Sequence, residues 1–231
     1  MNFRMCTGAC RLASLLAGLA PASPALAAHD GQIWTNGSVT AKLSGNWRVS
    51  DEVTARFSDR RNGLYEIESN TLVGYAVDNG VTLWAGYTHN PQYAAGDFTI
   101  MEHRTREQVT LDNFAQLGRG SFNGRVRMEQ RWRQGVDGMG WRMRPYVKYT
   151  LPFRKGGRTA LVLSAEPFFN LNRTAFQRAS GLDRIRTLIG VSTPITNNVR
   201  AEVGYLNQHT FVPDRPDNDD HVLSFSLNLS M

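Results

Sequence analysis

The chain has 231 residues, of which 41% are hydrophobic and 20% are charged, and its formal net charge is +6. This composition is too polar for a bundle of membrane helices and too apolar for a disordered chain. Both cysteines, Cys6 and Cys10, lie in the first 27 residues. If that segment is removed, disulfides, cysteine nucleophiles and thiolate-zinc sites are excluded from the mature chain.

Residues 1–27 have the organisation of a cleaved signal peptide. Arg4 and Arg11 precede an apolar stretch at 12–20, and an Ala-Leu-Ala triplet at 25–27 follows. Such a stretch is far shorter than the roughly 20 residues that a membrane-spanning helix needs. We therefore expect export with cleavage after Ala27, and no nucleic acid as a partner, because the chain leaves the compartment that holds it.

The rest of the chain, residues 28–231, is expected to form one all-β domain. From Gln32 onward, about eleven segments of eleven to fifteen residues alternate with period two, and no convincing helical stretch is present. The last segment is typical, because apolar residues at 223, 225, 227, 229 and 231 alternate with serine and asparagine.

The links between these segments are of two lengths. Short links at 44–46, 78–80, 154–157 and 196–198 alternate with longer ones at 59–63, 90–100, 171–179 and 212–219. In a membrane barrel, short turns belong to the periplasm and long loops to the outside, and the number of strands is even. We therefore expect an extra short strand between Gln32 and Leu43, which gives twelve strands. Placing that region in the lumen would give ten.

Three similar stretches, residues 72–79, 83–90 and 201–208, each contain a Gly-Tyr step. In this register the glycine points inward and the tyrosine outward. Glycine inside a strand is destabilising unless it permits curvature or close approach, so these steps predict a bent sheet.

Charged residues gather on one face of the predicted strands. Seven of the eight glutamates lie there together with most of the basic residues, and arginine outnumbers lysine 23 to 3. Because guanidinium groups pair with carboxylates in planar, bidentate fashion, this pattern favours a packed ionic lumen over a solvated surface. The expected lumen network consists of Glu66, Glu68, Arg104, Arg106, Arg125, Arg127, Glu129, Arg131, Arg142, Arg144, Lys148, Glu166, Arg184, Arg186, Arg200 and Glu202. The same face carries Arg48, Glu52, Arg56, Glu102 and Arg133.

The opposite face is apolar and carries aromatic residues near the ends of segments. They are Trp47, Phe57, Tyr65, Tyr75, Tyr87, Trp141, Tyr149, Phe153, Tyr205 and Phe211. This distribution indicates the interfacial girdles of a membrane barrel. Since unpaired strand edges are not tolerated in lipid, the predicted fold is a closed, antiparallel, up-and-down transmembrane β-barrel. The alternative is a soluble sandwich or lipocalin-like barrel, with the apolar face inside.

Several short stretches resemble the outer-membrane barrel family known as domain of unknown function number 2490. They are residues 102–108, 125–131, the strand around Glu166, residues 204–209 and residues 220–223. The resemblance implies an outer-membrane barrel with no assigned activity. Its partners would be outer-membrane lipid, lipopolysaccharide and the barrel assembly machinery, which reads the last strand. Met231 stands where such barrels usually end in an aromatic residue.

Four histidines, His89, His103, His209 and His221, are expected near the extracellular ends of strands and on the outer face. Amphipathic side chains at a membrane interface account for them, and a rim catalytic role is the alternative. Four aspartates at 214, 217, 219 and 220 are either solvated or hold a divalent cation. No triad spacing, metal box or nucleotide motif is present in the sequence, so no cofactor is expected.

The favoured function is a non-enzymatic outer-membrane barrel whose Arg/Glu lumen is structural or forms a narrow, anion-leaning pore. One alternative is an outer-membrane enzyme acting on lipid or lipopolysaccharide at the extracellular rim. The other is a soluble periplasmic β-barrel binding protein.

Overall fold

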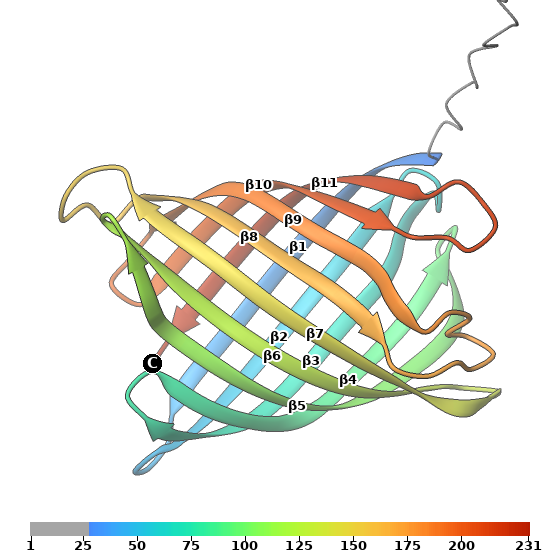
Figure 1. Ribbon diagram of the computed structural model, residues 1–231, viewed down its shortest axis with the longest axis horizontal. Coiled ribbons are helices and arrows are strands. Elements are labelled where there is room, and N and C mark those ends of the chain that lie inside the picture. Colours follow the sequence, from blue (N-terminus) through green and yellow to red (C-terminus); the bar gives the residue numbers. More distant parts are fainter. Residues whose placement is uncertain (1–27) are drawn as a thin grey trace, which may run out of the picture.

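Eleven strands form the described part of the chain, residues 28–231 of a computed structural model (Figure 1). They are β1 Ala28–Lys42, β2 Trp47–Ser58, β3 Gly63–Asp78, β4 Val81–Ala94, β5 Asp97–Leu117, β6 Gly120–Arg133, β7 Val136–Pro152, β8 Ala160–Asn170, β9 Gly181–Pro194, β10 Val199–Thr210 and β11 Asn218–Ser230. The predicted signal segment, with Cys6 and Cys10, lies outside the described residues. No helix in the described range has the length and apolar character to cross a membrane.

The strands close into a barrel in which each sequential pair is antiparallel and β1 pairs with β11 in parallel. The parallel register runs from Ala28 opposite Asn218 to Thr40 opposite Ser230. The all-β closed barrel predicted from the sequence is confirmed, but the expected strand number of twelve, or of ten, is wrong. Residues 32–43 hide no second strand and do not enter the lumen, because β1 is one strand bonded to β2 on one side and β11 on the other. With an odd number of strands, the first and last run in the same direction, and parallel pairing satisfies both edges.

The two ends of the barrel differ in their connections. We call the end where β1 begins the N end and the end where β11 finishes the C end (Figure 1). The longest link, residues 171–180, lies at the N end. The N-end link 211–217 and the C-end link 153–159 have seven residues each, so the short link expected at 154–157 is longer than predicted. The long loop expected at 90–100 is absent from the described residues, because β4 and β5 continue to a two-residue turn at Ala95 and Gly96, both with positive φ.

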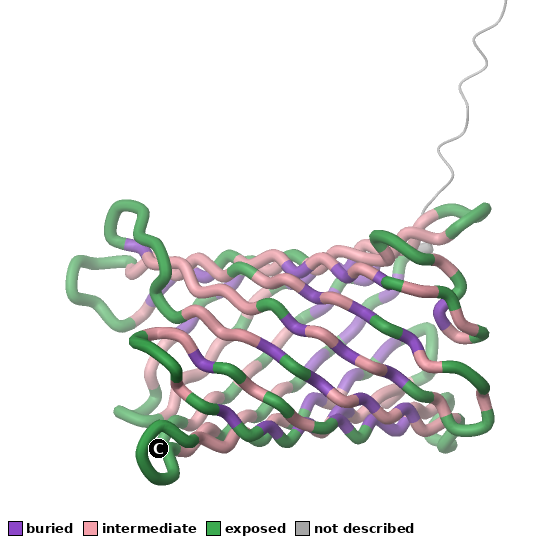
Figure 2. Tube along the Cα trace, turned by 60° about the horizontal axis from the view of Figure 1, so that its bottom comes forward, coloured by how far each residue is buried: buried purple, intermediate pink, exposed green. Residues whose placement is uncertain are grey.

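Burial alternates along the strands, with arginines, glutamates and amides inside and apolar side chains outside (Figure 2). Outward residues such as Val53, Leu227 and Ile189 are about half exposed, at 49%, 56% and 53%. Tyr65 departs from the prediction, because a bulge between the Arg56 and Phe57 pairings leaves it without a partner across the sheet. It turns inward and donates a hydrogen bond to Gln32 Oε1 at 2.8 Å.

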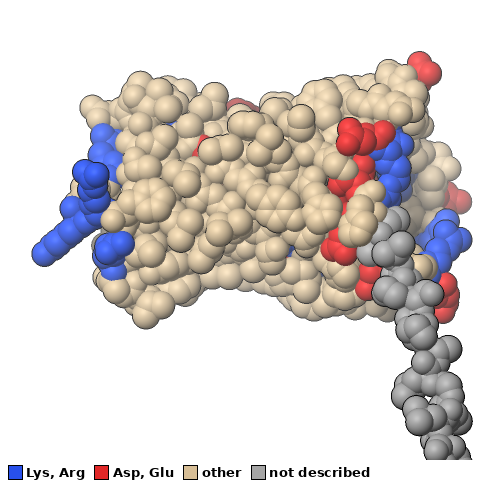
Figure 3. All heavy atoms as spheres, turned by 90° about the horizontal axis from the view of Figure 1, so that it is seen from above, with Lys and Arg blue, Asp and Glu red and all other residues tan. Residues whose placement is uncertain are grey.

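The face of the outer wall seen in Figure 3 is almost uncharged over most of its height. Basic side chains gather at one end of this face, both basic and acidic side chains gather at the other, and a broad band between them carries almost none. Elsewhere on the wall, Asp51 and Glu107 are outward and exposed. Aromatic residues lie near the limits of this band, for example the edge-to-face pair Trp47 and Tyr75, whose ring centroids are 5.0 Å apart. A barrel with this surface has its polar core inside and its apolar face outside.

The glycines of the Gly-Tyr steps permit a close approach of neighbouring strands. Tyr75, Tyr87 and Tyr205 point outward and are 40–47% exposed. A Cβ atom added to Gly86 would lie 2.2 Å from the backbone oxygen of Thr71, so only glycine fits there.

Candidate functional site

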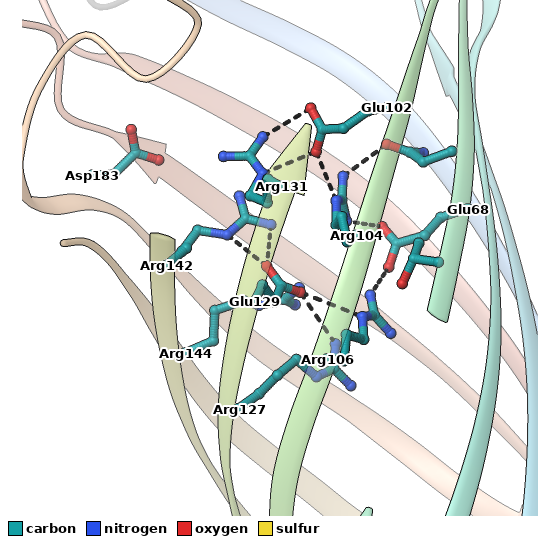
Figure 4. Close-up of polar contacts among 12 residues, drawn as sticks. Glu68, Glu102, Arg104, Arg106, Arg127, Glu129, Arg131, Arg142, Arg144 and Asp183 are labelled. Atoms are coloured by element: carbon teal, nitrogen blue, oxygen red, sulfur yellow. Dashed lines mark hydrogen bonds and ion pairs between the residues drawn. The ribbon is translucent and has the colours of Figure 1, made fainter. Parts of the chain in front are cut away.

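The lumen contains a connected network of ion pairs built from strands β2 to β8, and Figure 4 shows its centre. Glu102, on β5, is fully buried. Its carboxylate accepts from Arg104 Nε at 2.7 Å, from Arg131 Nε at 2.9 Å and from Arg133 Nε at 2.6 Å. One carboxylate therefore joins three guanidinium groups from two adjacent strands.

Glu129, on β6, is the second centre and is also fully buried. Its two oxygens accept from Arg142 Nε at 2.7 Å and Arg144 Nη1 at 2.8 Å, and Arg106 Nε lies 3.5 Å away. Arg144 continues to Glu166, whose two oxygens both lie 3.0 Å from its Nη2. Since β6, β7 and β8 are neighbours, these ion pairs connect adjacent strands on one side of the barrel, on the lumen face.

Glu66 and Glu68, on β3, join the opposite side to this network. Arg56 on β2 approaches Glu66 at 2.6 Å and Glu68 at 3.1 Å. Arg104 and Arg106 on β5 also contact Glu68, the first of them at 3.1 Å. Because β3 and β5 are separated by β4, these contacts bridge over the intervening strand.

The network does not satisfy every guanidinium nitrogen. Among the described residues, Arg106 Nε and Nη1, Arg56 Nε and Arg125 Nε are buried without a hydrogen-bond acceptor. Arg127 is held mainly by an amide, because its Nε donates to Gln108 Oε1 at 2.9 Å and its nearest carboxylate is Glu129 at 3.9 Å. The lumen is thus richer in cationic donors than in anionic acceptors.

Packed side chains close the lumen. Six residues from six different strands are no more than 1% exposed: Asn70, Thr88, Arg106, Glu129, Phe168 and Val222. A small apolar cluster of Trp34, Leu206 and Val222, with Leu188 packed against it, fills the side under β1, β9, β10 and β11. A water-filled channel past these side chains would expose them, and we call the packed side chains around Arg106 and Glu129 the closed layer.

Residues 31–219 match the family described as Protein of unknown function (DUF2490). The chain belongs to this family. It is also similar to an uncharacterized protein of Methylorubrum extorquens, with 29% identity over 200 residues, which cover 86% of this chain and 87% of the relative. The family resemblance predicted from the sequence is confirmed. Neither comparison names an activity, so function in this DUF2490 barrel has to be argued from the site.

The sixteen residues predicted for the network fall into three groups in the structure. Eleven take part in the connected ion pairs: Glu66, Glu68, Arg104, Arg106, Arg125, Arg127, Glu129, Arg131, Arg142, Arg144 and Glu166. Lys148 and Glu202 form a separate pair at 2.6 Å toward the C end. The other three bind elsewhere.

Arg184, Arg186 and Arg200 are these three. Arg184 pairs with its neighbour Asp183 at 2.7 Å, and Arg200 Nη1 donates to the backbone oxygen of Arg158 and to Ser192 Oγ. Arg186 Nε donates to Gln208 Oε1 at 2.8 Å.

Aromatic and amide members of the lumen were not predicted. Phe168 is 1% exposed, and four guanidinium carbons lie within 5.7 Å of its ring centroid. The inward direction of Phe168 could have been predicted, because it lies two residues after the inward Glu166. Gln177, from the loop after β8, reaches Arg131 Nη1 at 3.2 Å, and nothing in its sequence context signals this contact.

The histidines lie on the outer wall near the N end, as predicted. Tyr87 and His103 share a short hydrogen bond, and Tyr205 Oη lies 2.6 Å from His221 Nδ1. His209 contacts Asp219 at 3.0 Å and Asp217 at 3.2 Å.

The aspartates after β10 do not converge on a cation site. Asp217 and Asp219 bind His209, whereas Asp220 points inward and accepts from Gln208 Nε2 at 2.7 Å. No group of three or more acidic, histidine or cysteine side chains within residues 28–231 is arranged to hold a metal ion.

Proposed function

We propose that this chain is an exported outer-membrane β-barrel, processed after Ala27, whose closed ionic lumen makes it a structural barrel. The observation that carries the proposal is the inverted arrangement of its faces, with apolar side chains outside and arginine-glutamate pairs inside. In water, exposed apolar area is unfavourable by roughly 25 cal/mol per Å², whereas acyl chains accommodate it. A soluble binding protein would place these two faces the other way round.

The dimensions of the wall support the same placement. Its strands have 11 to 21 residues, and a tilted strand needs about 9–11 to cross the hydrocarbon core. The parallel seam between β1 and β11 leaves no open edge, which is the condition for strands in lipid.

The loops favour an orientation with the C end in the periplasm and the N end outside. Outer-membrane lipid and lipopolysaccharide would then contact the wall, and the assembly machinery would read β11. The histidines would lie at the outer interface, where imidazole and phenol groups are well accommodated.

The closed layer around Arg106 and Glu129 favours a structural role over conduction. Because the lumen holds more arginines than carboxylates, any residual leak would favour anions. A rim enzyme has less support, because the hydrogen bonds of the outer histidines go to tyrosine, aspartate or a second histidine. This arrangement provides no activated serine or threonine nucleophile.

Two measurements test the proposal. Outer membranes are isolated from cells producing the full chain, and the protein is run on gels with and without boiling. We expect it in the outer-membrane fraction, with faster migration before boiling. Recovery in the soluble periplasm would refute the membrane placement. In planar bilayers we expect no openings beyond small anion-preferring steps, and large openings would refute the closed lumen.

A further inference from the structure

A polar cavity of about 300 Å³ opens into the lumen from the N end. Glu68, Arg104 and Arg144 of the ionic network are part of its lining, so it stands directly on the closed layer. At roughly 30 Å³ for each water molecule, its volume corresponds to about ten waters. The cavity can therefore hold a small hydrated ion or a compact polar ligand.

The lining of this cavity is strongly cationic. Ten arginines and four carboxylates contribute to it, a formal excess of six positive charges. Four carboxylates outside the lining also pair with some of these arginines; they belong to Glu102, Glu129, Glu166 and Asp183. They also serve Arg106, Arg125 and Arg127, so thirteen arginines share eight carboxylates in this half of the lumen.

Four of the lining arginines gather around Phe168. The guanidinium carbons of Arg144, Arg186, Arg142 and Arg184 lie 4.3, 4.7, 5.2 and 5.7 Å from its ring centroid. All four arginines and the ring line the cavity. A cation above an aromatic face is stabilised by about 0.5–2 kcal/mol, but four like charges this close also repel one another.

Arg186 is the least compensated member of this group. No carboxylate within the described residues lies at ion-pair distance from it. Besides Phe168, its guanidinium carbon lies 4.5 Å from the ring centroid of Trp34. Its hydrogen-bond partner is the neutral Gln208. An anion bound here would relieve the repulsion without displacing an existing ion pair.

We propose that this cavity binds phosphate or a phosphate monoester against Arg142, Arg184 and Arg186. A dianion offsets more of the excess of arginines over carboxylates in this half of the lumen than chloride does, and its several oxygens suit planar guanidinium donors. The site depends on side chains inside the barrel and not on where the barrel is located. If phosphate does not bind, the proposed membrane placement is unaffected. If the barrel is not in the outer membrane, the proposed phosphate site is unaffected.

The test uses the mature barrel refolded in detergent, with inorganic phosphate as the probe and chloride at equal ionic strength as the reference. Isothermal calorimetry and the shift in melting temperature report binding. We expect Arg186→Gln to weaken phosphate binding at least tenfold, about 1.4 kcal/mol. Without phosphate, this variant leaves no carboxylate unpaired but loses the contacts of Arg186 with Trp34, Phe168 and Gln208, so its own phosphate-free melting temperature is the baseline for the shift. Arg154→Gln, in the exposed turn after β7, is the matched control and should bind phosphate normally.

A second arm separates free phosphate from a lipid-borne phosphate group. Glucose 6-phosphate and vesicles containing lipopolysaccharide are titrated into the same proteins. Binding of either that depends on Arg186 supports the site and identifies its source. The proposal is overturned if no probe binds, if the Arg186→Gln variant binds like the wild type, or if the Arg154 control loses affinity equally.

Discussion

Replacing Glu129 with leucine tests whether the ionic lumen holds the barrel together. The substitution removes the carboxylate that joins β6 to β7, and leucine fills part of its volume. Arg144 keeps Glu166 and Arg106 keeps Glu68. Arg142 and Arg127, however, lose the carboxylate that lies 2.5 and 3.9 Å from them, and the described residues provide no other within 4.0 Å.

The expected loss follows from these two unpaired charges. Removing one partner of a buried ion pair costs about 3–5 kcal/mol, because the remaining charge stays away from water. Arg127 contributes little to this figure, since its contact with Glu129 is long and its hydrogen bond to Gln108 persists. We therefore expect the free energy of unfolding of the Glu129→Leu variant to fall by about 3–5 kcal/mol.

Urea unfolding of the barrel in lipid vesicles, followed by tryptophan fluorescence, measures this loss. Glu107→Leu is the matched control, because Glu107 lies opposite Met128 in the same pair of strands but points outward and is exposed. It should not lower stability, because leucine is accommodated on the lipid-facing side at least as well as glutamate. An unaltered unfolding midpoint in the Glu129→Leu variant, or an equal loss in both variants, would contradict the claim that a network of mutually dependent ion pairs in the lumen stabilises the barrel.

Two further predictions concern other parts of the barrel. Gly86→Ala should reduce thermal stability by more than about 3 kcal/mol, since its Cβ would meet backbone, whereas Gly37→Ala, which faces open space, should be neutral in the same melting experiment. Phe168→Leu should cost about 2–3 kcal/mol in urea unfolding, because it creates a small void and removes four cation-ring contacts.

Alternation of side-chain types was enough to predict which face is which. In a two-sided wall, a one-residue error in register would reverse every side chain, so the pattern is strongly constrained by the fold. The glutamates at 68, 102 and 129 and their arginines therefore came out on the inner face. Tyr65 did not, because a single bulge changes direction locally without altering the surrounding pattern.

The number of strands and the presence of the cavity could not be predicted from this alternation. The general rule of even strand numbers led away from eleven, although the segments in the sequence number eleven. The cavity depends on convergence between distant residues, such as Trp34 on β1 and Arg186 on β9, which approach within 4.5 Å. Period-two patterns give the direction of a side chain but not which side chains meet across the lumen.

The parallel seam and the cationic cavity depend on each other through β1. This strand supplies Trp34, whose ring lies 4.7 Å from the guanidinium carbon of Arg56 and 4.5 Å from that of Arg186. It also places Asp30 opposite Asp220 in the seam, and both carboxylates line the cavity. A ten-stranded barrel formed without β1 would lack the Trp34 ring, which contacts both cations, and the Asp30 carboxylate. The eleventh strand therefore completes the wall of the proposed anion site as well as the closure of the sheet.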